Sequence, residues 1–428
     1  MKKRIITLLL SGCMCCSLFG CGGGDEHSTD PVKAQSGITC LTENIQTEEM
    51  MRQIDSYDQL SSGVNTFAMN MYRMLPEDSN CFFSPYSIVS ALSMLDVGAG
   101  GKTKEELEKT LGISNLEAWN YQMQSYVSRQ WSDETFVTTA NSIWMDNQRK
   151  WANSIEDEFL YPVKNYYGGD IYEANFGANP DDVVEGVNKW VSDNTNDMIP
   201  SILSELPSDV VMMLINAVYF EGKWSKEFDE KDTMESVFHG TNGDKDVDMM
   251  HTYDETYAYI DDGSIKGVSL PYRGENVVMK VFIPSNTDGN IGTLVGNLDN
   301  EQLMTLINSL DEAEYKKLNV LQLPKFEDEL SIEGMDDLLQ NMGIKSAYSD
   351  ADLSKISEDM AVSSVNHRAK IVVDECGTKA AAVTDIMVKA TAMPVEEIYN
   401  FIVDQPFFYV IEDMNTNMIL FMGRVNNL

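Results

Sequence analysis

The sequence predicts an α+β fold, with helices early in the chain and strands later. Helical periodicity and helix caps occupy residues 84–112. A long apolar run at 210–220 and shorter runs near the C-terminus are typical of buried strands. Helical segments that precede strand segments, instead of alternating with them, favour α+β over α/β. Apolar periodicity continues from Tyr57 to Leu428 without a long Pro/Gly/Ser linker, so we expect one large domain.

The first clear helix is expected to begin at Ser84 and Pro85. Serine is a good N-cap, and proline is tolerated at the first helical position because its missing N–H would be unpaired there anyway. An apolar stripe at helical spacing follows at Ile88, Ala91, Leu92 and Leu95. A glycine-rich stretch ends this helix. A capping-box pattern from Thr103 to Glu106 predicts that a second helix begins there and ends at Gly112.

Residues 210–220 form a long and nearly unbroken apolar run, bounded by Pro207 and Gly222. Such a run predicts a central strand that is buried on both faces. Asn216 lies within it, so its side chain must find hydrogen-bond partners in the core. Further buried strands are expected at 277–284, 407–411 and 419–422.

The N-terminus has the pattern of a targeting segment. Three basic residues open the chain, and an apolar stretch follows from Ile5. Gly20 and Cys21 then resemble a bacterial lipoprotein signal, in which residues 1–20 are removed and Cys21 is lipidated. Cys13 is the alternative lipidation site. We therefore expect an exported protein that an acyl anchor holds to the membrane of the cell envelope or surface, or that is released outside the cell.

Residues 21–53 are rich in Gly, Ser, Thr, Asp and Glu and have little apolar periodicity. This composition predicts a flexible tether, with the folded domain at 54–428.

The chain is strongly acidic, with 68 Asp and Glu against 31 Lys and Arg and a net charge of −37 at pH 7. Nucleic acid and anionic lipid surfaces repel such a protein, so no nucleic acid partner is expected.

Local motifs for catalysis and cofactor binding are incomplete. Beyond the signal, Cys40, Cys81 and Cys376 are too few and too far apart for a disulfide framework or a metal cluster, so we expect free thiols. The four histidines form no His-Glu-x-x-His motif, and no Gly-x-Ser-x-Gly elbow occurs. The glycine-rich stretch at 98–103 lacks the first glycine of a phosphate-binding loop. We therefore expect neither an enzyme nor a cofactor or metal site.

Small residues dominate 375–384, and their alternation predicts a strand with one buried and one wetted face. One side carries Thr378, Ala380, Ala382 and Thr384, and the other carries Lys379, Ala381, Val383 and Asp385. All the charges lie on the second side. Alanine and lysine are also good helix formers, so the local pattern leaves an alanine-rich helix equally open.

Several segments, in chain order, resemble the serpin family of protease inhibitors. They are residues 82–88, 188–191, 216–224, 323–326, 351–354, 375–382, 405–408 and 421–425. The resemblance extends from about residue 54 to the C-terminus. It implies a serpin-like single domain of the α+β class, with about nine helices packed on three β-sheets and an exposed reactive loop at about 376–400.

The resemblance also implies a mechanism, irreversible suicide-substrate inhibition of serine proteases. A protease cleaves the exposed loop and forms an acyl-enzyme, and the freed loop then inserts into the central sheet as an extra strand. Small residues that enter first, with one face suited to the core, fit this role. The alternation at 378–384 therefore favours an inhibitory member. The alternatives are a non-inhibitory binding protein of this fold and an inhibitor of cysteine proteases.

The family's distance from hinge to cleavage site places the scissile bond sixteen residues after Glu375, at Thr391–Ala392. A small residue before the bond suits an elastase-like protease with a shallow pocket. The runner-up bond, Lys389–Ala390, would suit a trypsin-like pocket.

The resemblance assigns the other site residues. The hinge of the reactive loop comprises Glu375, Gly377, Thr378, Ala380, Ala381 and Ala382. A polar cluster under the central sheet, where strands part to admit the loop, comprises Ser84, Ser87, Asn216 and His367. Trp224 matches the top of the same opening. We expect His367 to be a hydrogen-bonded core histidine, and the protein to be a monomer that forms a covalent complex with its target protease.

Overall fold

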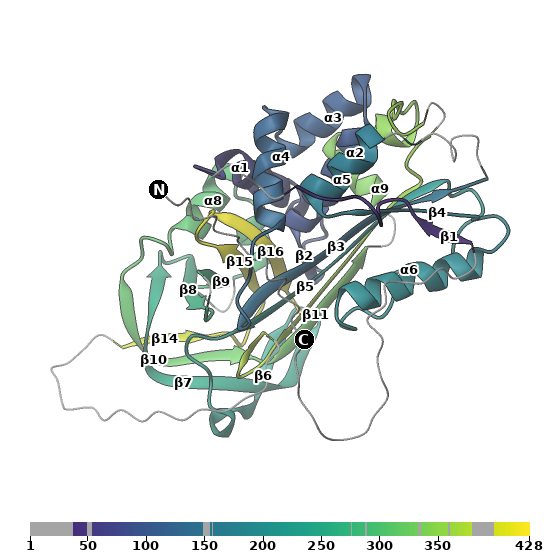
Figure 1. Cartoon of the computed structure of the whole chain (residues 1–428). Helices are drawn as coiled ribbons and strands as arrows, with labels where there is room; N and C mark the ends of the chain where they lie inside the picture. Colours follow the sequence, from purple (N-terminus) through teal and green to yellow (C-terminus); the bar gives the residue numbers. More distant parts are fainter. Residues whose placement is uncertain are drawn as a thin grey trace, which may run out of the picture. The chain divides into compact units, whose positions relative to one another are not determined.

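A seven-stranded sheet, which we call sheet A, lies at the centre of the computed structural model (Figure 1). The structure describes residues 37–48, 54–148, 155, 157–274, 276–286, 289–332, 335–357, 360–378 and 398–428. Across sheet A the strands are, in order, β1 (Ile38–Cys40), β4 (Asp170–Ala174), β3 (Thr135–Asp146), β5 (Met212–Lys223), β13 (Gly377–Thr378), β12 (Ser364–Val373) and β11 (Phe326–Ile332).

Strand β5 is buried on both faces, which confirms the prediction from its apolar run. Alternate side chains enter two different cores, since successive residues of a strand point to opposite faces. Leu214 and Val218 belong to the larger core, and Ile215 and Ala217 belong to the smaller one. Helix α6 (Pro180–Asn194) covers the smaller core with Val187 and other apolar side chains.

The described residues contain nine α-helices, the number expected. Besides α6 they are α1 (Asp58–Tyr72), α2 (Pro85–Gly98), α3 (Gly101–Leu111), α4 (Leu116–Val127), α5 (Asp157–Tyr167), α7 (Ile291–Gly296), α8 (Asn300–Asn308) and α9 (Asp336–Met342). In Figure 1 the helices α1 to α5 lie together on the side of sheet A away from α6. Among the described helices, none has the length and apolarity needed to cross a membrane.

The two predicted helix starts have different outcomes. Helix α2 begins as predicted, because the Ser84 side chain accepts a hydrogen bond from the Ser87 N–H at 3.2 Å. The capping box predicted at Thr103 is wrong, since α3 already begins at Gly101. The Thr103 hydroxyl accepts a hydrogen bond from the Asp352 N–H at 2.9 Å instead. A partner about 250 residues away in sequence has replaced the local cap.

The other strands form a second hydrogen-bonded network. Its order is β14 (Tyr399–Ile402), β10 (Tyr315–Pro324), β7 (Gly243–Asp261), β8 (Ile265–Pro271), β9 (Val277–Pro284), β15 (Phe407–Asp413), β16 (Met418–Val425) and β2 (Cys81–Phe83), with β6 (Met234–Gly240) paired to β7. The 19-residue β7 pairs in succession with β6, β10 and β8. Because this one strand is shared, two of the three expected sheets are joined into one network.

The predicted tether at 21–53 is wrong for residues 37–48, which belong to the folded unit. Strand β1 pairs antiparallel with β4 at the edge of sheet A. Thr42 is fully buried and donates a hydrogen bond to the Asp170 carboxylate at 3.2 Å. Farther on, the backbone N–H of Glu48 donates to the side chain of Asn165 at 2.9 Å. Backbone pairing at a sheet edge needs little apolar periodicity, so composition could not reveal this segment.

Candidate functional site

The candidate site lies along the contact between β5 and β12, the one parallel pair at the centre of sheet A. Residues Ser364 to Lys370 of β12 pair with Met213 to Tyr219 of β5. Above this stretch the two strands separate, and the short strand β13 lies between them. The two strands therefore pair directly along residues 213–219 and 364–370. Toward their C-terminal ends, which we call the top of the contact, β13 lies between them.

Strand β13 is antiparallel to both of its neighbours. Gly377 and Thr378 pair with Lys223 and Gly222 of β5, and Thr378 also pairs with Val373 of β12. A side chain at 377 would not fit, because a Cβ there would lie 2.0 Å from the carbonyl oxygen of Gly222. Glycine at 377 is thus what allows the chain to pass this close to β5.

A tight turn carries the chain from β12 into β13. The backbone N–H of Asp374 donates to the carbonyl of Gly377 at 2.8 Å. The Asp374 carboxylate accepts from the N–H groups of Cys376 at 2.9 Å and Gly377 at 3.2 Å. This side chain thereby holds the turn that aims β13 between its neighbours.

The side chain of Thr378 is fully buried on the lower face of sheet A, next to two stacked aromatic rings. Its hydroxyl lies 2.9 Å from the hydroxyl of Tyr272. The Tyr272 ring stacks on Trp224, with centroids 4.4 Å apart. Trp224 in turn donates from its indole N–H to the carbonyl of Asp374 at 3.0 Å. Burial raises the pKa of Tyr272, so its hydroxyl stays protonated as a hydrogen-bonding group.

The carboxylate of Glu375 connects the turn to two other segments. One oxygen accepts from the hydroxyl of Thr233 at 2.7 Å, and the other pairs with Lys325 Nζ at 2.8 Å. Burial opposes ionisation of this carboxyl, but the hydrogen bonds from Lys325 and Thr233 outweigh it and lower the pKa of Glu375. Glu375 is therefore ionised at neutral pH, and its ion pair fastens the turn to the start of β11.

A second set of contacts, the polar cluster, lies lower along the same strands. The Asn216 amide of β5 donates to the Ser87 carbonyl of α2 at 3.1 Å, to the Ser87 hydroxyl and to Asn141 of β3. Its oxygen pairs with Nδ1 of His367 of β12. Asn216 is the common partner of all these groups, so one side chain ties both central strands to the helix beneath them.

His367 adopts one tautomer in this cluster. Its Nε2 accepts from the backbone N–H of Ser84 at 3.4 Å, so Nδ1 carries the proton and donates to Asn216. The imidazole is fully buried, and burial lowers its pKa to about 3. The ring is therefore neutral at pH 7 with both of its nitrogens hydrogen-bonded, in agreement with the expected core histidine.

The structure brings the predicted site residues into two groups along the contact between β5 and β12. The polar cluster contains Ser84, Ser87, Asn216 and His367. The upper group contains Trp224, Glu375, Gly377 and Thr378. The other predicted residues lie outside the described residues; they are Cys13, Cys21, Ala380, Ala381, Ala382, Lys389, Ala390, Thr391 and Ala392.

Sequence reasoning missed four residues that complete these groups, namely Asn141, Thr233, Tyr272 and Lys325. A polar residue within a strand, as at Asn141, is a usable signal because a buried amide needs partners. Thr233 and Lys325 have no local signal, since they are 142 and 50 residues from Glu375 in sequence.

Known proteins resemble the chain along most of its length. The family model described as Serpin (serine protease inhibitor) matches residues 62–428. An uncharacterized serpin-like protein of Thermococcus kodakarensis is 34% identical, over 87% of this chain and 88% of the relative. Leukocyte elastase inhibitor A of Mus musculus is 32% identical, over 86% of this chain and 99% of the relative.

Solved structures agree with the sequence comparison. The crystal structure of the thermophilic serpin tengpin in the native state superimposes with a TM-score of 0.80 and 27% identity. The match covers 92% of this chain and all of that one. The chain therefore belongs to the serpin family of serine protease inhibitors.

Proposed function

We propose that this protein inhibits serine proteases irreversibly, as a suicide substrate whose cleaved loop inserts into sheet A. The observation that carries the proposal is strand β13. It occupies the top of the contact between β5 and β12 and is antiparallel to both strands. A longer strand in the same direction would pair on both sides if the parallel contact below it opened. The chain that would extend it is the predicted reactive loop.

The direction of Thr378 supports the predicted alternation. Its side chain points under sheet A toward Tyr272, so every second residue after it would also face the core in an inserted strand. Ala380, Ala382 and Thr384 are then the inward residues, and all are small. Lys379 and Asp385 would face outward, where water can solvate their charges. Insertion would thus bury no charge in this part of the loop.

An elastase-like protease is the proposed target. The predicted scissile bond, Thr391–Ala392, presents a small side chain that suits a shallow pocket. The resemblance to a mouse protein named leukocyte elastase inhibitor A supports this choice. The runner-up bond, Lys389–Ala390, would instead direct the inhibitor to trypsin-like proteases.

Incubation with pancreatic elastase and, separately, with trypsin tests the function. We expect an SDS-resistant complex of one inhibitor chain and one elastase chain, and a released C-terminal peptide that begins at Ala392. Mass spectrometry of that peptide identifies the scissile bond, and light scattering of the free protein checks that it is a monomer. If both proteases, and a papain-like protease as the third arm, cleave the loop without forming a complex, the inhibitory function is wrong and the non-inhibitory alternative stands.

The proposal also includes an acyl anchor at Cys21 that holds the inhibitor to the cell envelope or surface. Expression with an alkyne-tagged fatty acid should label the wild-type protein and the Cys13→Ser variant, but not Cys21→Ser. Labelling that disappears only in Cys13→Ser would move the anchor to that residue. An unlabelled wild-type protein would contradict lipidation.

A further inference from the structure

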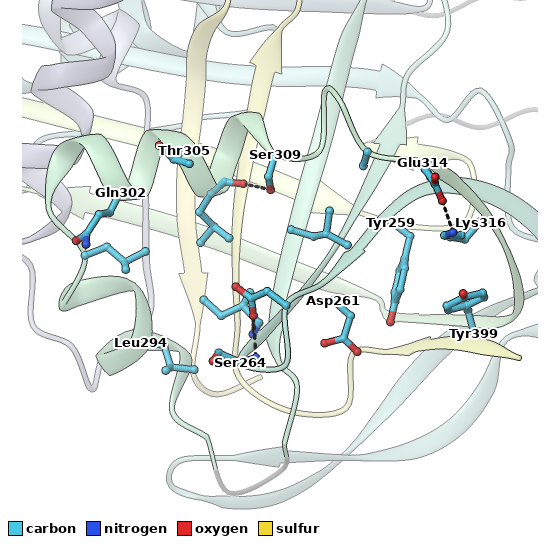
Figure 2. A pocket seen from close by; sticks show the side chains of 16 residues that line it. Tyr259, Asp261, Ser264, Leu294, Gln302, Thr305, Ser309, Glu314, Lys316 and Tyr399 are labelled. Carbon is cyan, nitrogen blue, oxygen red and sulfur yellow. Dashed lines mark hydrogen bonds and ion pairs between the residues drawn. The ribbon is translucent and has the colours of Figure 1, made fainter. Parts of the chain in front are cut away.

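A cavity of about 860 Å³ lies beside the second network of strands (Figure 2). Residues of β7, β8, α7, α8, β10 and β14 line it. In Figure 2, Tyr259 and Tyr399 lie at one end and Leu294 and Gln302 at the other, with Asp261 between them. We call it the α8 groove. Its volume falls within the range of about 300–1,000 Å³ that is usual for small-molecule sites.

Three leucines line the helical side of the α8 groove, together with the polar side chains of Gln302, Thr305 and Ser309. We call α7 and the two residues after it, residues 291–298, the α7 segment; Leu294 and Leu298 belong to it, and Leu306 belongs to α8. All three are only partly buried, although each packs against the core. Ile260 and Ile265 face them from the hairpin between β7 and β8. An apolar chain laid here would remove the exposed parts of the three leucines from water.

The opposite end is an aromatic corner. The rings of Tyr259 and Tyr399 lie 5.5 Å apart and are inclined at 59°. The Nζ atom of Lys316 already lies 5.6 Å from the centroid of the Tyr399 ring. Ring faces attract cations through their quadrupole, and paired aromatic rings are a known setting for alkylammonium groups.

Carboxylates outnumber ammonium groups around this corner. The lining contains Asp261, Asp262 and Glu314 but one cation, Lys316, which pairs with Glu314. One oxygen of Asp261 accepts from the hydroxyl of Ser285 at 2.8 Å, which orients the carboxylate. The Tyr259 hydroxyl stays uncharged at neutral pH, since burial and the nearby Asp261 raise the pKa of Tyr259 to about 12. The aromatic end is therefore complementary to a positive charge.

We propose that the α8 groove binds an amphipathic organic cation, namely an alkylammonium with a single apolar chain. The ammonium head would lie against Tyr259, Tyr399 and Asp261, and the chain would lie along the leucines of the α7 segment and α8. Fatty acids of the same length are disfavoured, because their carboxylate would meet Asp261 and Glu314. This site is separate from the hinge and from the polar cluster, so it does not depend on the inhibitory function.

Isothermal titration calorimetry with decyltrimethylammonium, below its micelle concentration, tests the proposal on the full chain. We expect one site, and binding of decanoate at least about tenfold weaker because of charge repulsion. Leu306→Arg should weaken binding of the cation about tenfold or more, since it places a like charge in the apolar lining. Leu298→Arg is the second variant, in case the first fails to fold as judged by circular dichroism.

Asp261→Asn and its matched control Asp209→Asn test whether the ammonium head group binds next to Asp261. Both remove one exposed negative charge, but Asp209 lies outside the groove. Asp261→Asn should weaken binding several-fold, whereas Asp209→Asn should leave it unchanged. The proposal is wrong if decanoate binds equally well, or if the folded arginine variants bind like wild type. Many weak sites that respond equally to both Asp variants would mean general attraction to an acidic protein and would also overturn it.

Discussion

At the scale of single residues, His367 and Asn216 hold the two central strands of sheet A together. The imidazole N–H donates to the amide oxygen of Asn216, and the Asn216 amide N–H donates to Ser87. This buried pair is stable only while the imidazole stays neutral, because a charged ring would be buried without a counter-charge. We therefore expect protonation of His367 to weaken this contact between β5 and β12.

The first prediction is a loss of stability in mild acid that depends on His367. The ordinary pKa of 6.5 falls to about 3 in the folded protein because the ring is buried. Between these values the unfolded chain binds a proton that the folded chain does not, so stability is lost as pH falls below 6.5. This group should lower the free energy of unfolding by about 2 kcal/mol between about pH 8 and about pH 5.

Urea unfolding of wild type and His367→Asn over that range measures the effect. Burial raises the pKa of Asp328 to about 7, and its contribution has the opposite sign, since it is lost as pH rises. Asp328 is present in both proteins, so the difference between them isolates His367. Parallel stability curves for the two proteins would show that the histidine does not act in this way.

At the scale of elements, the inserted strand would continue β13, and Thr378 sets which of its residues face inward. Ala382 is four residues later in the sequence and would face the core in that inserted strand, whereas Ala381 would face outward. The second prediction compares Ala382→Arg with Ala381→Arg as its matched control. Ala382→Arg should turn the inhibitor into a substrate, because insertion would bury a charge.

Titration of elastase activity should give a stoichiometry of inhibition about tenfold higher for Ala382→Arg. The Ala381→Arg variant should stay near wild type. Equal values for the two variants would contradict the alternation.

At the scale of the whole molecule, the proposed insertion would exchange one parallel contact for a strand that is paired on both sides. Seven residue pairs join β5 and β12 between Ser364 and Lys370 and would have to separate. A continued β13 would replace them with antiparallel pairing to both strands. The intact protein would thus hold a sheet that can still gain a strand.

The last prediction is that cleavage within the loop raises thermal stability. Each new backbone hydrogen bond contributes about 1 kcal/mol, so the cleaved protein should unfold at least about 10 °C higher than the intact protein. Differential scanning calorimetry before and after limited proteolysis measures this shift. Ala382→Arg cleaved at the same bond is the control and should gain less. An unchanged or lower Tm after cleavage would contradict insertion.

Local patterns predicted a large part of the fold. The double burial of β5 follows from its unbroken apolar run, and the start of α2 follows from Ser84 and Pro85. Both depend on neighbours within a few residues, and such signals are legible in sequence. The hinge was recognised by its family resemblance, and only its residues Glu375, Gly377 and Thr378 lie within the described part of the chain.

Contacts between distant segments account for what the pattern could not predict. Three such contacts join residues far apart in sequence. They are the hydrogen bond between Thr103 and Asp352 near the start of α3, the pairing of β1 with β4, and the ion pair between Glu375 and Lys325. The same is true of the α8 groove, whose aromatic corner combines Tyr259 with Tyr399. Sequence alone established the class of fold, the central strand and the alternation of small residues after Glu375, because periodicity and capping depend on residues that are close together in sequence. The tertiary structure established where β13 lies and what holds it, because packing decides which distant polar groups share a partner.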